Sequence, residues 1–283
     1  MKKGVSVIIV LLLSTASFAG PQENKPAVNK PTETNLAEIK PAETQPAEKK
    51  LSFAYDITYI SKYMTKGFEG YGQQGGLFNS IDVDLYGTGF GINVLHRNAI
   101  ASGYVNKQRM DYTLYYKTKL FEGTPFAMNT DISATFKDYY KLALNKSKTL
   151  YEWIFAFSWP NIMPGGLYPY YIVHYEYPAV ELRNPKYRHM TGWVHRFGLG
   201  YDLKVNELPN PLQLTSEIAY TDGIEGAAHD WSYATFGMAT KFDITKNLTF
   251  APGIYEQITM DKSACLGARR DITYCRLSMK YKF

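Results

Sequence analysis

The residues in this 283-residue sequence that could take part in hydrolytic chemistry include five histidines: His96, His174, His189, His195 and His229. A serine nucleophile needs a neighbouring base, and on one face of a β-strand the two would stand two positions apart. No serine stands two positions after any of these histidines. The sequence therefore offers no Ser-His pair of this kind.

Two smaller groups of titratable side chains suggest other chemistry. Asp222, His229 and Asp230 fall in one short segment, where two acids and a histidine could form a protease site. A loop histidine beside Asp-Trp is more often solvated polar surface. His174 and Glu176 share one face of an expected strand, but a metal site needs more ligands than this pair. We expect no enzyme activity, metal or cofactor, and a hydrolase is the lesser alternative.

The elements that carry these residues are predicted to be β-strands, because apolar and polar residues alternate with period two from Leu51 to Phe283. Gly, Pro and Asn interrupt the alternation, and no helical periodicity persists for three turns. We predict an all-β fold of twelve strands: 51–63, 78–87, 89–98, 108–121, 125–140, 149–160, 167–178, 190–205, 211–221, 231–244, 247–260 and 271–283.

The connections between these strands alternate in length. Brief turns are expected at 87–89, 122–125 and 245–247, whereas the segments 64–79, 99–107, 222–230 and 261–270 are longer. An even number of strands with short turns at one end and longer loops at the other is typical of a transmembrane antiparallel β-barrel. A secreted soluble β-sandwich is the alternative.

Charged residues segregate to one face of the expected strands. Trp153, Phe155 and Phe157 face one way on the sixth strand, and Glu152 faces the other. A lipid-facing Arg or Lys at mid-depth costs about 2–4 kcal/mol, so the charged face should be the lumen. Glu256 and His195 fall on the apolar face, which places them near the outer interface or requires a bulge. The predicted pore-lining residues are Asp56, Lys62, Asp82, Asp84, Lys117, Asp131, Lys137, Glu152, Glu176, Arg196, Glu217, Lys241, Arg276 and Lys280.

The segment before the strands divides into two parts. Residues 1–19 combine Lys2 and Lys3 with an apolar run and Ser17-Phe18-Ala19, which predicts a secretory signal peptide. Residues 20–50 are rich in Pro, Glu, Lys and Thr and lack aromatic residues, which predicts a disordered periplasmic linker. We interpret this linker as a spacer, with contact to peptidoglycan or a periplasmic partner as the functional alternative. The predicted barrel occupies 51–283, and no run of 18 apolar residues offers a transmembrane helix.

The final strand resembles the C-terminal signal that the assembly machinery of the Gram-negative outer membrane reads on β-barrel proteins. Residues 273–283 alternate strictly, and Tyr281 and Phe283 lie on the apolar face. The resemblance implies a location in the outer membrane of a Gram-negative bacterium, with outer-membrane lipid and that machinery as partners.

Three segments resemble TorF-type porins and related uncharacterised outer-membrane barrels. They are YISKYMTKGF (59–68), LGYDLKVNELPNPLQLTSEIAYTDG (199–223) and AAHDWSYATFGMATKFDITKNLTFAPGIY (227–255), and the resemblance extends over most of 51–283. Lys66 stands where that pattern has Arg. The resemblance implies a porin-like barrel of undefined substrate, and it brings no catalytic residues.

Composition agrees with this class. The 24 Tyr, 15 Phe and 4 Trp residues suit two interfacial aromatic belts. A net charge of +5 without a long basic run indicates no nucleic-acid partner. Cys265 and Cys275 form a candidate disulfide if the exported chain brings their Cα atoms within about 7 Å.

The predicted function follows from barrel size. Twelve strands lie between the eight that fill their own interior and the sixteen or more that leave a wide pore. We therefore expect a narrow charged channel for small hydrophilic solutes, with passage depending on whether an outer loop folds inward. The alternative is a structural or adhesive barrel with an occluded lumen. At the seam between the first and last strands we expect an ion-pair cluster of Asp56, Asp82, Asp84, Arg276 and Lys280.

Overall fold

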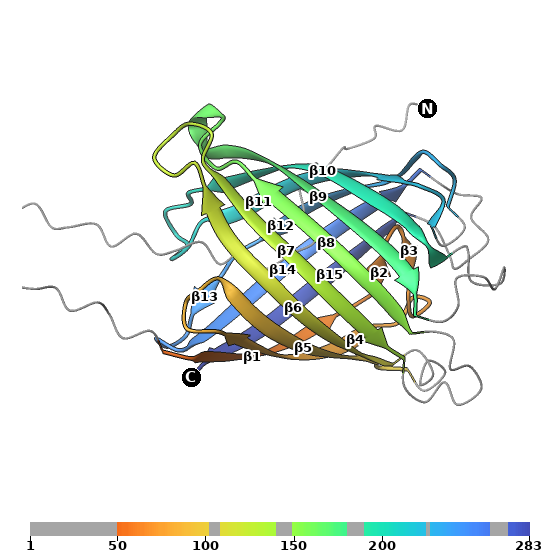
Figure 1. The fold of residues 1–283 in the computed structure, drawn as a ribbon. Coiled ribbons are helices and arrows are strands. Elements are labelled where there is room, and N and C mark those ends of the chain that lie inside the picture. Colours follow the sequence, from red (N-terminus) through yellow and green to blue (C-terminus); the bar gives the residue numbers. More distant parts are fainter. Residues whose placement is uncertain (1–49, 102–107, 140–148, 180–189, 225–226, 261–270) are drawn as a thin grey trace, which may run out of the picture.

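The computed structural model describes residues 50–101, 108–139, 149–179, 190–224, 227–260 and 271–283, most of which form strands (Figure 1). The twelve long strands are β1 (Ser52–Ile60), β4 (Gly76–Asp84), β5 (Phe90–Ala99), β6 (Arg109–Leu120), β7 (Met128–Asp138), β8 (Leu150–Ser158), β9 (Leu167–Pro178), β10 (Gly192–Leu203), β11 (Leu212–Thr221), β12 (Trp231–Ala239), β14 (Leu248–Thr259) and β15 (Ile272–Lys282). Short elements are β2 (Met64–Thr65), β3 (Phe68–Glu69), β13 (Phe242–Asp243) and the 3-10 helix η2 (Pro164–Gly166). Within the described ranges, no helix is long and apolar enough to cross a membrane.

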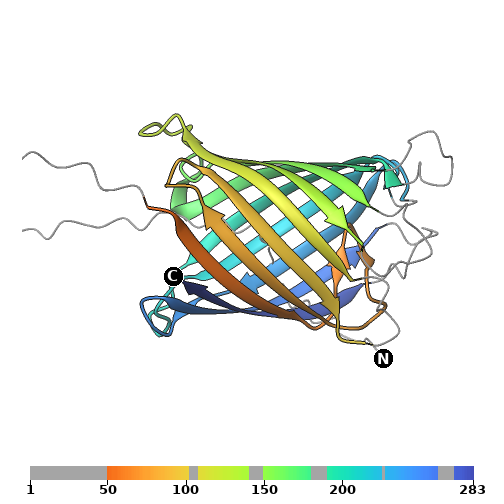
Figure 2. The ribbon, with the colours of Figure 1, turned by 60° about the horizontal axis from the view of Figure 1, so that its bottom comes forward.

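The long strands form one closed antiparallel barrel. Each pairs with the next long strand along the chain, and β13 is a short extension beside β14. Closure depends on β1, which pairs with β4 on one edge and β15 on the other, so Asp56 lies opposite both Ser80 and Lys280. Figure 2 shows the resulting cylinder of tilted strands. The predicted twelve-stranded barrel is confirmed, and closure gives each of the twelve long strands a partner on both sides.

The two ends of the barrel differ. Residues 85–89, 121–127, 159–166, 204–211 and 240–247 connect strands at the end where β1 begins and β15 ends (Figure 2). The connections at the opposite end are 61–75, 100–108, 139–149, 179–191, 222–230 and 260–271. Following the usual architecture of outer-membrane barrels, we call these the periplasmic end and the outer end.

Side chains alternate between the lumen and the outer surface. On β8, Tyr151 and Trp153 are exposed on the outside, whereas Glu152 between them is 7% exposed and faces the lumen. The other strands keep this alternation, because the side-chain period of a strand is two. An apolar outer surface around a charged interior is the distribution that a lipid environment favours.

The two residues expected to depart from the charge pattern do face outward. Unbroken registers along β10 and β14 place His195 and Glu256 on the outer surface, close to the outer ends of their strands. The hydroxyl of Tyr171 lies 2.7 Å from His195 Nδ1, and Thr273 donates to Glu256. Of the two explanations for these residues, the position near the outer interface is therefore the right one. The irregularity lies elsewhere, between Ala219 and Tyr220.

Inward-facing glycines make room for tyrosine rings that lie against the wall. A Cβ atom added to Gly198 would stand 2.0 Å from Cζ of Tyr170, and one added to Gly91 would stand 2.1 Å from Cζ of Tyr115. Gly200 has the same relation to Tyr168, at 2.2 Å. Because these rings occupy the space of the missing side chains, each glycine is a steric requirement.

We expect Gly198→Ala to lower the free energy of unfolding by about 1–3 kcal/mol, the usual cost of overpacking. The new methyl group must displace the Tyr170 ring, whose hydroxyl donates to Glu217 at 3.2 Å. Urea unfolding followed by tryptophan fluorescence measures the change. In a Tyr170→Ala background the same substitution should cost far less, and strict additivity of the two changes would contradict this account.

Candidate functional site

The connection between β1 and β4 enters the lumen as a hairpin. We call residues 61–75 the lumenal hairpin; its strands β2 and β3 pair Met64 with Glu69 and Thr65 with Phe68. Lys66 and Gly67 form the turn with φ angles of 47° and 89°. Two consecutive positive φ angles are typical of a tight hairpin turn, and a glycine at the second position is well suited to it. Figure 1 places this hairpin at the outer end, away from the C-terminus.

Aromatic packing holds the base of the lumenal hairpin. The Tyr63 ring centroid lies 4.8 Å from that of Tyr71 and 5.2 Å from that of Phe78 on β4. These rings are buried in one cluster with Tyr255 and Tyr274, on β14 and β15. Burial raises the pKa of Tyr71, which keeps this phenol protonated. The base is therefore fixed to the wall at the seam.

The tip of the hairpin reaches the opposite wall. The Lys66 ammonium lies 3.6 Å from Glu152 Oε1 and also contacts Glu176 Oε2, on β8 and β9. The sheet order places five strands between β1 and β9 along each side of the barrel. Lys66 therefore spans the lumen, and the hairpin forms a bar across it.

Glu152 and Glu176, which we call the glutamate pair, also share a cation from the wall. Lys137 Nζ on β7 lies 2.8 Å from Glu152 Oε2 and 2.5 Å from Glu176 Oε2. All three side chains are buried, with exposures of 5% for Lys137, 8% for Glu152 and 2% for Glu176. Two cations and two carboxylates thus balance in charge at this point.

Two further groups of ion-paired side chains flank the glutamate pair. Asp111 accepts from Arg97 Nε at 2.7 Å and lies 2.8 Å from Arg109 Nε. On the other side, Arg196 binds Glu217 with two nitrogens, at 2.7 and 2.8 Å. Such forked contacts are the strong form of an Arg-carboxylate pair.

His174 links Arg196 to Glu152 of the glutamate pair. Its Nε2 lies 3.2 Å from Arg196 Nη1, which can only donate, so Nε2 accepts. A neutral ring then carries its proton on Nδ1, which lies 3.4 Å from Glu152 Oε1. A continuous polar network thus runs from Arg196 to the lumenal hairpin. Within the described ranges, no group of three or more His, Cys, Asp or Glu side chains is suited to hold a metal ion.

A cavity of about 240 Å³ lies beside this network. It is lined by Thr65 and Lys66 of the hairpin and by wall residues that include His174, Arg196 and Gln257. The cavity can hold water or one small polar molecule. It adjoins the bar that the hairpin forms across the lumen.

The predicted pore-lining residues separate by depth. Lys137, Glu152, Glu176, Arg196 and Glu217 meet in the buried network of the outer half. Nearer the periplasmic end, Lys117 and Asp131 lie 3.8 Å apart, and the Lys117 side chain is 42% exposed.

Two predicted pore-lining residues are not on the long wall strands. Lys62 belongs to the lumenal hairpin, and Lys241 is exposed in the break between β12 and β13. Sequence analysis did not assign a role to Lys66, Arg109 or Tyr63. The Lys66-Gly67 dipeptide between two aromatic stretches is the signal that could have revealed the turn.

At the seam the predicted phasing holds, but the contacts differ from those expected. Asp56 lies opposite Lys280 and on the same face as Arg276. Its carboxylate accepts from Thr58 at 2.6 Å and from Ser278 at 2.5 Å. Asp82 accepts from Tyr115 and Asn93, and Asp84 accepts from the backbone of Gly87. The described hydrogen bonds of these carboxylates thus come from neutral donors, while Lys280 interacts electrostatically with Asp82 and Asp56.

Other sequence expectations fall outside the described residues. Cys275 lies on the outward face of β15, and Cys265 lies in 261–270, so the disulfide stays a prediction. The expected signal peptide, 1–19, and nearly all of the linker, 20–50, also lie outside the described ranges. In the segment 222–230, which offered two acids and a histidine, His229 Nδ1 lies 2.7 Å from Asp222 Oδ1, and both side chains are exposed.

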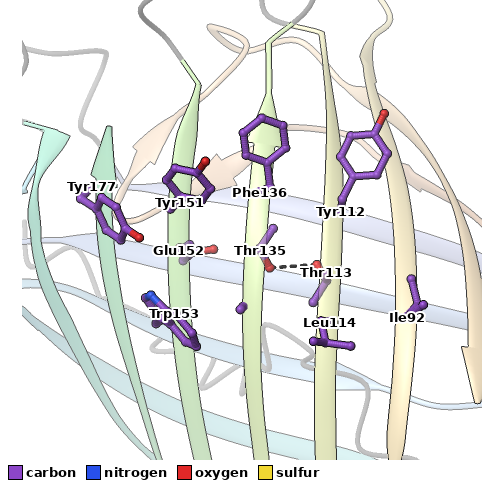
Figure 3. Close-up of a pocket in the computed structure, with 11 residues that line it drawn as sticks. Ile92, Tyr112, Thr113, Leu114, Thr135, Phe136, Tyr151, Glu152, Trp153 and Tyr177 are labelled. Carbon is purple, nitrogen blue, oxygen red and sulfur yellow. Dashed lines mark hydrogen bonds between the residues drawn. The ribbon is translucent and has the colours of Figure 1, made fainter. Parts of the chain in front are cut away.

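A second hollow lies on the outer surface of the barrel. It has a volume of about 480 Å³, and Tyr112, Phe136, Tyr151 and Trp153 line it (Figure 3). Ala134, whose register partners are Leu114 and Trp153, also lines it. The hollow exists because Ala134 is small among large neighbours. Its apolar side chains face the region that lipid would fill, so we assign it to the lipid-contacting surface.

Comparison with known proteins gives a likeness at the level of fold. No protein-family model matches the chain, and no curated protein sequence matches it. The NanC porin superposes with a TM-score of 0.51 at 10% identity, over 81% of this chain and 100% of that one. The KdgM porin in complex with disordered oligogalacturonate gives 0.45 at 11% identity, over 82% and 99%. The COG4313 outer membrane channel from Pseudomonas putida F1 gives 0.45 at 10% identity, over 87% and 100%.

Proposed function

We propose that this protein is a narrow channel of the Gram-negative outer membrane for small hydrophilic solutes, closed at rest by the lumenal hairpin. The observation that carries the proposal is that the bar across the outer half is a connecting segment and not the wall itself. Lys66 holds the tip through ion pairs, and strands β2 and β3 pair with each other and with no described wall strand. A segment held in this way can move out of the lumen while the strand pairing of the barrel wall stays intact.

The charged interior supports passage of polar solutes. Inward-facing ionic side chains are present in both halves of the barrel. Examples are Asp82 and Lys117 in the periplasmic half and Arg196 and Glu217 in the outer half. Side chains of this kind line selective pores. A TorF-type porin is the finer assignment within this proposal, with outer-membrane lipid, the barrel assembly machinery and a periplasmic contact of the linker as its partners.

The rival function is a structural or adhesive barrel, and the closed outer half is the observation that favours it. An enzyme is the weaker candidate. The described histidines are His96, His174, His195 and His229, and each has a non-serine neighbour within hydrogen-bond reach, such as Arg196 for His174 and Asp222 for His229. We therefore propose a channel without enzymatic activity.

Planar-bilayer recordings of the purified full chain test the channel. We expect brief openings separated by long closed periods, because the tip of the hairpin is held by a few side chains. Swelling of proteoliposomes in small sugars should be slow but measurable against protein-free vesicles. If neither the full chain nor a variant without the hairpin carried ionic current, the channel would be rejected and the structural barrel favoured.

A further inference from the structure

The glutamate pair is unusual because its two members are direct cross-strand neighbours. Glu152 on β8 lies opposite Glu176 on β9 in the antiparallel register. Like charges in this position destabilise a sheet, and these two are also buried. The arrangement therefore requires cations beside it.

The described wall supplies one ammonium for these two carboxylates. Lys137 contacts both, and His174 approaches Glu152 as a ring whose Nε2 accepts from Arg196. The next wall cations, Arg97 and Arg109, have their described ion pairs with Asp111 rather than with the glutamate pair. One of the two buried carboxylate charges therefore has no described contact to a wall ammonium or guanidinium, and such a contact is what a buried charge requires.

The second cation comes from the lumenal hairpin. Lys66 Nζ contacts Glu152 Oε1 and Glu176 Oε2, and it belongs to a segment that crosses the lumen. A primary ammonium has three donors and is compact, so it can contact both carboxylates from the lumenal side. Lys66 therefore acts as a bound ammonium ligand that happens to be attached to the same chain.

We propose that the glutamate pair is a binding site for the primary ammonium group of a solute, which Lys66 occupies while the hairpin is docked. When the hairpin withdraws, a soluble ammonium takes its place and restores the local charge balance. The cavity of about 240 Å³ beside Lys66 provides room for the rest of a small molecule. This inference rests on the proposed channel for its link to transport, and it names small organic ammonium ions as the favoured solutes.

The test replaces the tethered ammonium with a free one. Lys66→Ala in the full chain removes three methylene groups and the ammonium, and n-propylammonium supplies the same atoms. We expect propylammonium chloride to raise the heat-unfolding temperature of this variant by several degrees over equal concentrations of sodium chloride. The wild-type chain should show no such difference, because Lys66 already fills the site.

A matched variant tests the role of charge. In Lys66→Ala with Glu176→Gln, Lys137 and Glu152 balance each other, so propylammonium should have no more effect than sodium. If Lys66→Ala does not fold, the variant in which Asn-Gly replaces residues 61–75 serves instead. Equal unfolding temperatures in propylammonium and sodium for the hairpin-free or Lys66→Ala barrel would overturn the site.

Recordings separate this inference from the proposed function. In a potassium chloride gradient, we expect the reversal potential of Lys66→Ala to move toward the potassium potential relative to wild type. Thermal stabilisation by propylammonium without any conductance would support the binding site and contradict the channel. Conductance without stabilisation would support the channel and contradict the ammonium site.

Discussion

Replacing residues 61–75 with Asn-Gly is expected to turn a mostly closed channel into a mostly open one. Ile60 and Gly76 are register partners at the ends of β1 and β4, so a two-residue turn can join these strands directly. The change removes the aromatic base of Tyr63 and Tyr71 together with the ion pairs of Lys66. Since the hairpin is the bar across the outer half, its loss should widen the path for ions and small solutes.

Single-channel recording measures this effect as a several-fold rise in mean conductance and a loss of long closures. The matched control replaces residues 121–127 with Asn-Gly at the periplasmic end. Leu120 and Met128 are register partners there, and the turn is almost wholly exposed. The control should conduct as the full chain does. Equal conductance of the hairpin-free variant and the full chain would show that the hairpin does not close the pore.

Lys137→Met is expected to lower the free energy of unfolding by about 3–5 kcal/mol, the usual cost of removing one partner from a buried ion pair. Lys137 contacts both members of the glutamate pair, and its own side chain is 5% exposed. Methionine fills a similar volume, so the loss would arise from charge rather than from a cavity. Urea unfolding of the barrel in lipid vesicles measures the difference.

Lys117→Met is the control for this substitution. Lys117 also faces the lumen, but its side chain is 42% exposed and its ammonium lies 3.8 Å from Asp131. Such hydrated pairs contribute about 0–1 kcal/mol. If Lys137→Met costs no more than Lys117→Met, the network of the outer half does not stabilise the barrel as its burial implies.

The barrel could be predicted because period-two alternation is a local property. Trp153 and Glu152 are adjacent in sequence, and their opposite faces follow from strand geometry alone. Asp56 and Lys280 are far apart in sequence, but an even number of antiparallel strands makes the first and last strands antiparallel neighbours, in which these residues stand at similar depth. The predicted strand ends were less accurate. The first strand ends at Ile60 rather than at the predicted residue 63, and the next begins at Gly76 rather than at the predicted residue 78.

The lumenal hairpin could not be predicted in the same way. Its strands have two residues each, too few for a periodic pattern, and the contacts of its tip lie on distant strands. Lys66 meets Glu152 and Glu176 only because the barrel wall brings them across the lumen. Every inward charge is an equal candidate for such a contact until the register is known. The neutral partners of Asp56 at the seam escaped prediction for the same reason.

The contacts of the lumenal hairpin also restrict the order of events during folding. Its base packs on Tyr255 and Tyr274 from the last two strands, while its tip binds β8 and β9 from the middle of the chain. All of these contacts exist together only when β1 has joined β15, and pairings this distant in sequence form late because of their loop-closure entropy. The full set of hairpin contacts therefore requires a closed cylinder, so the docked hairpin reports that the barrel is complete.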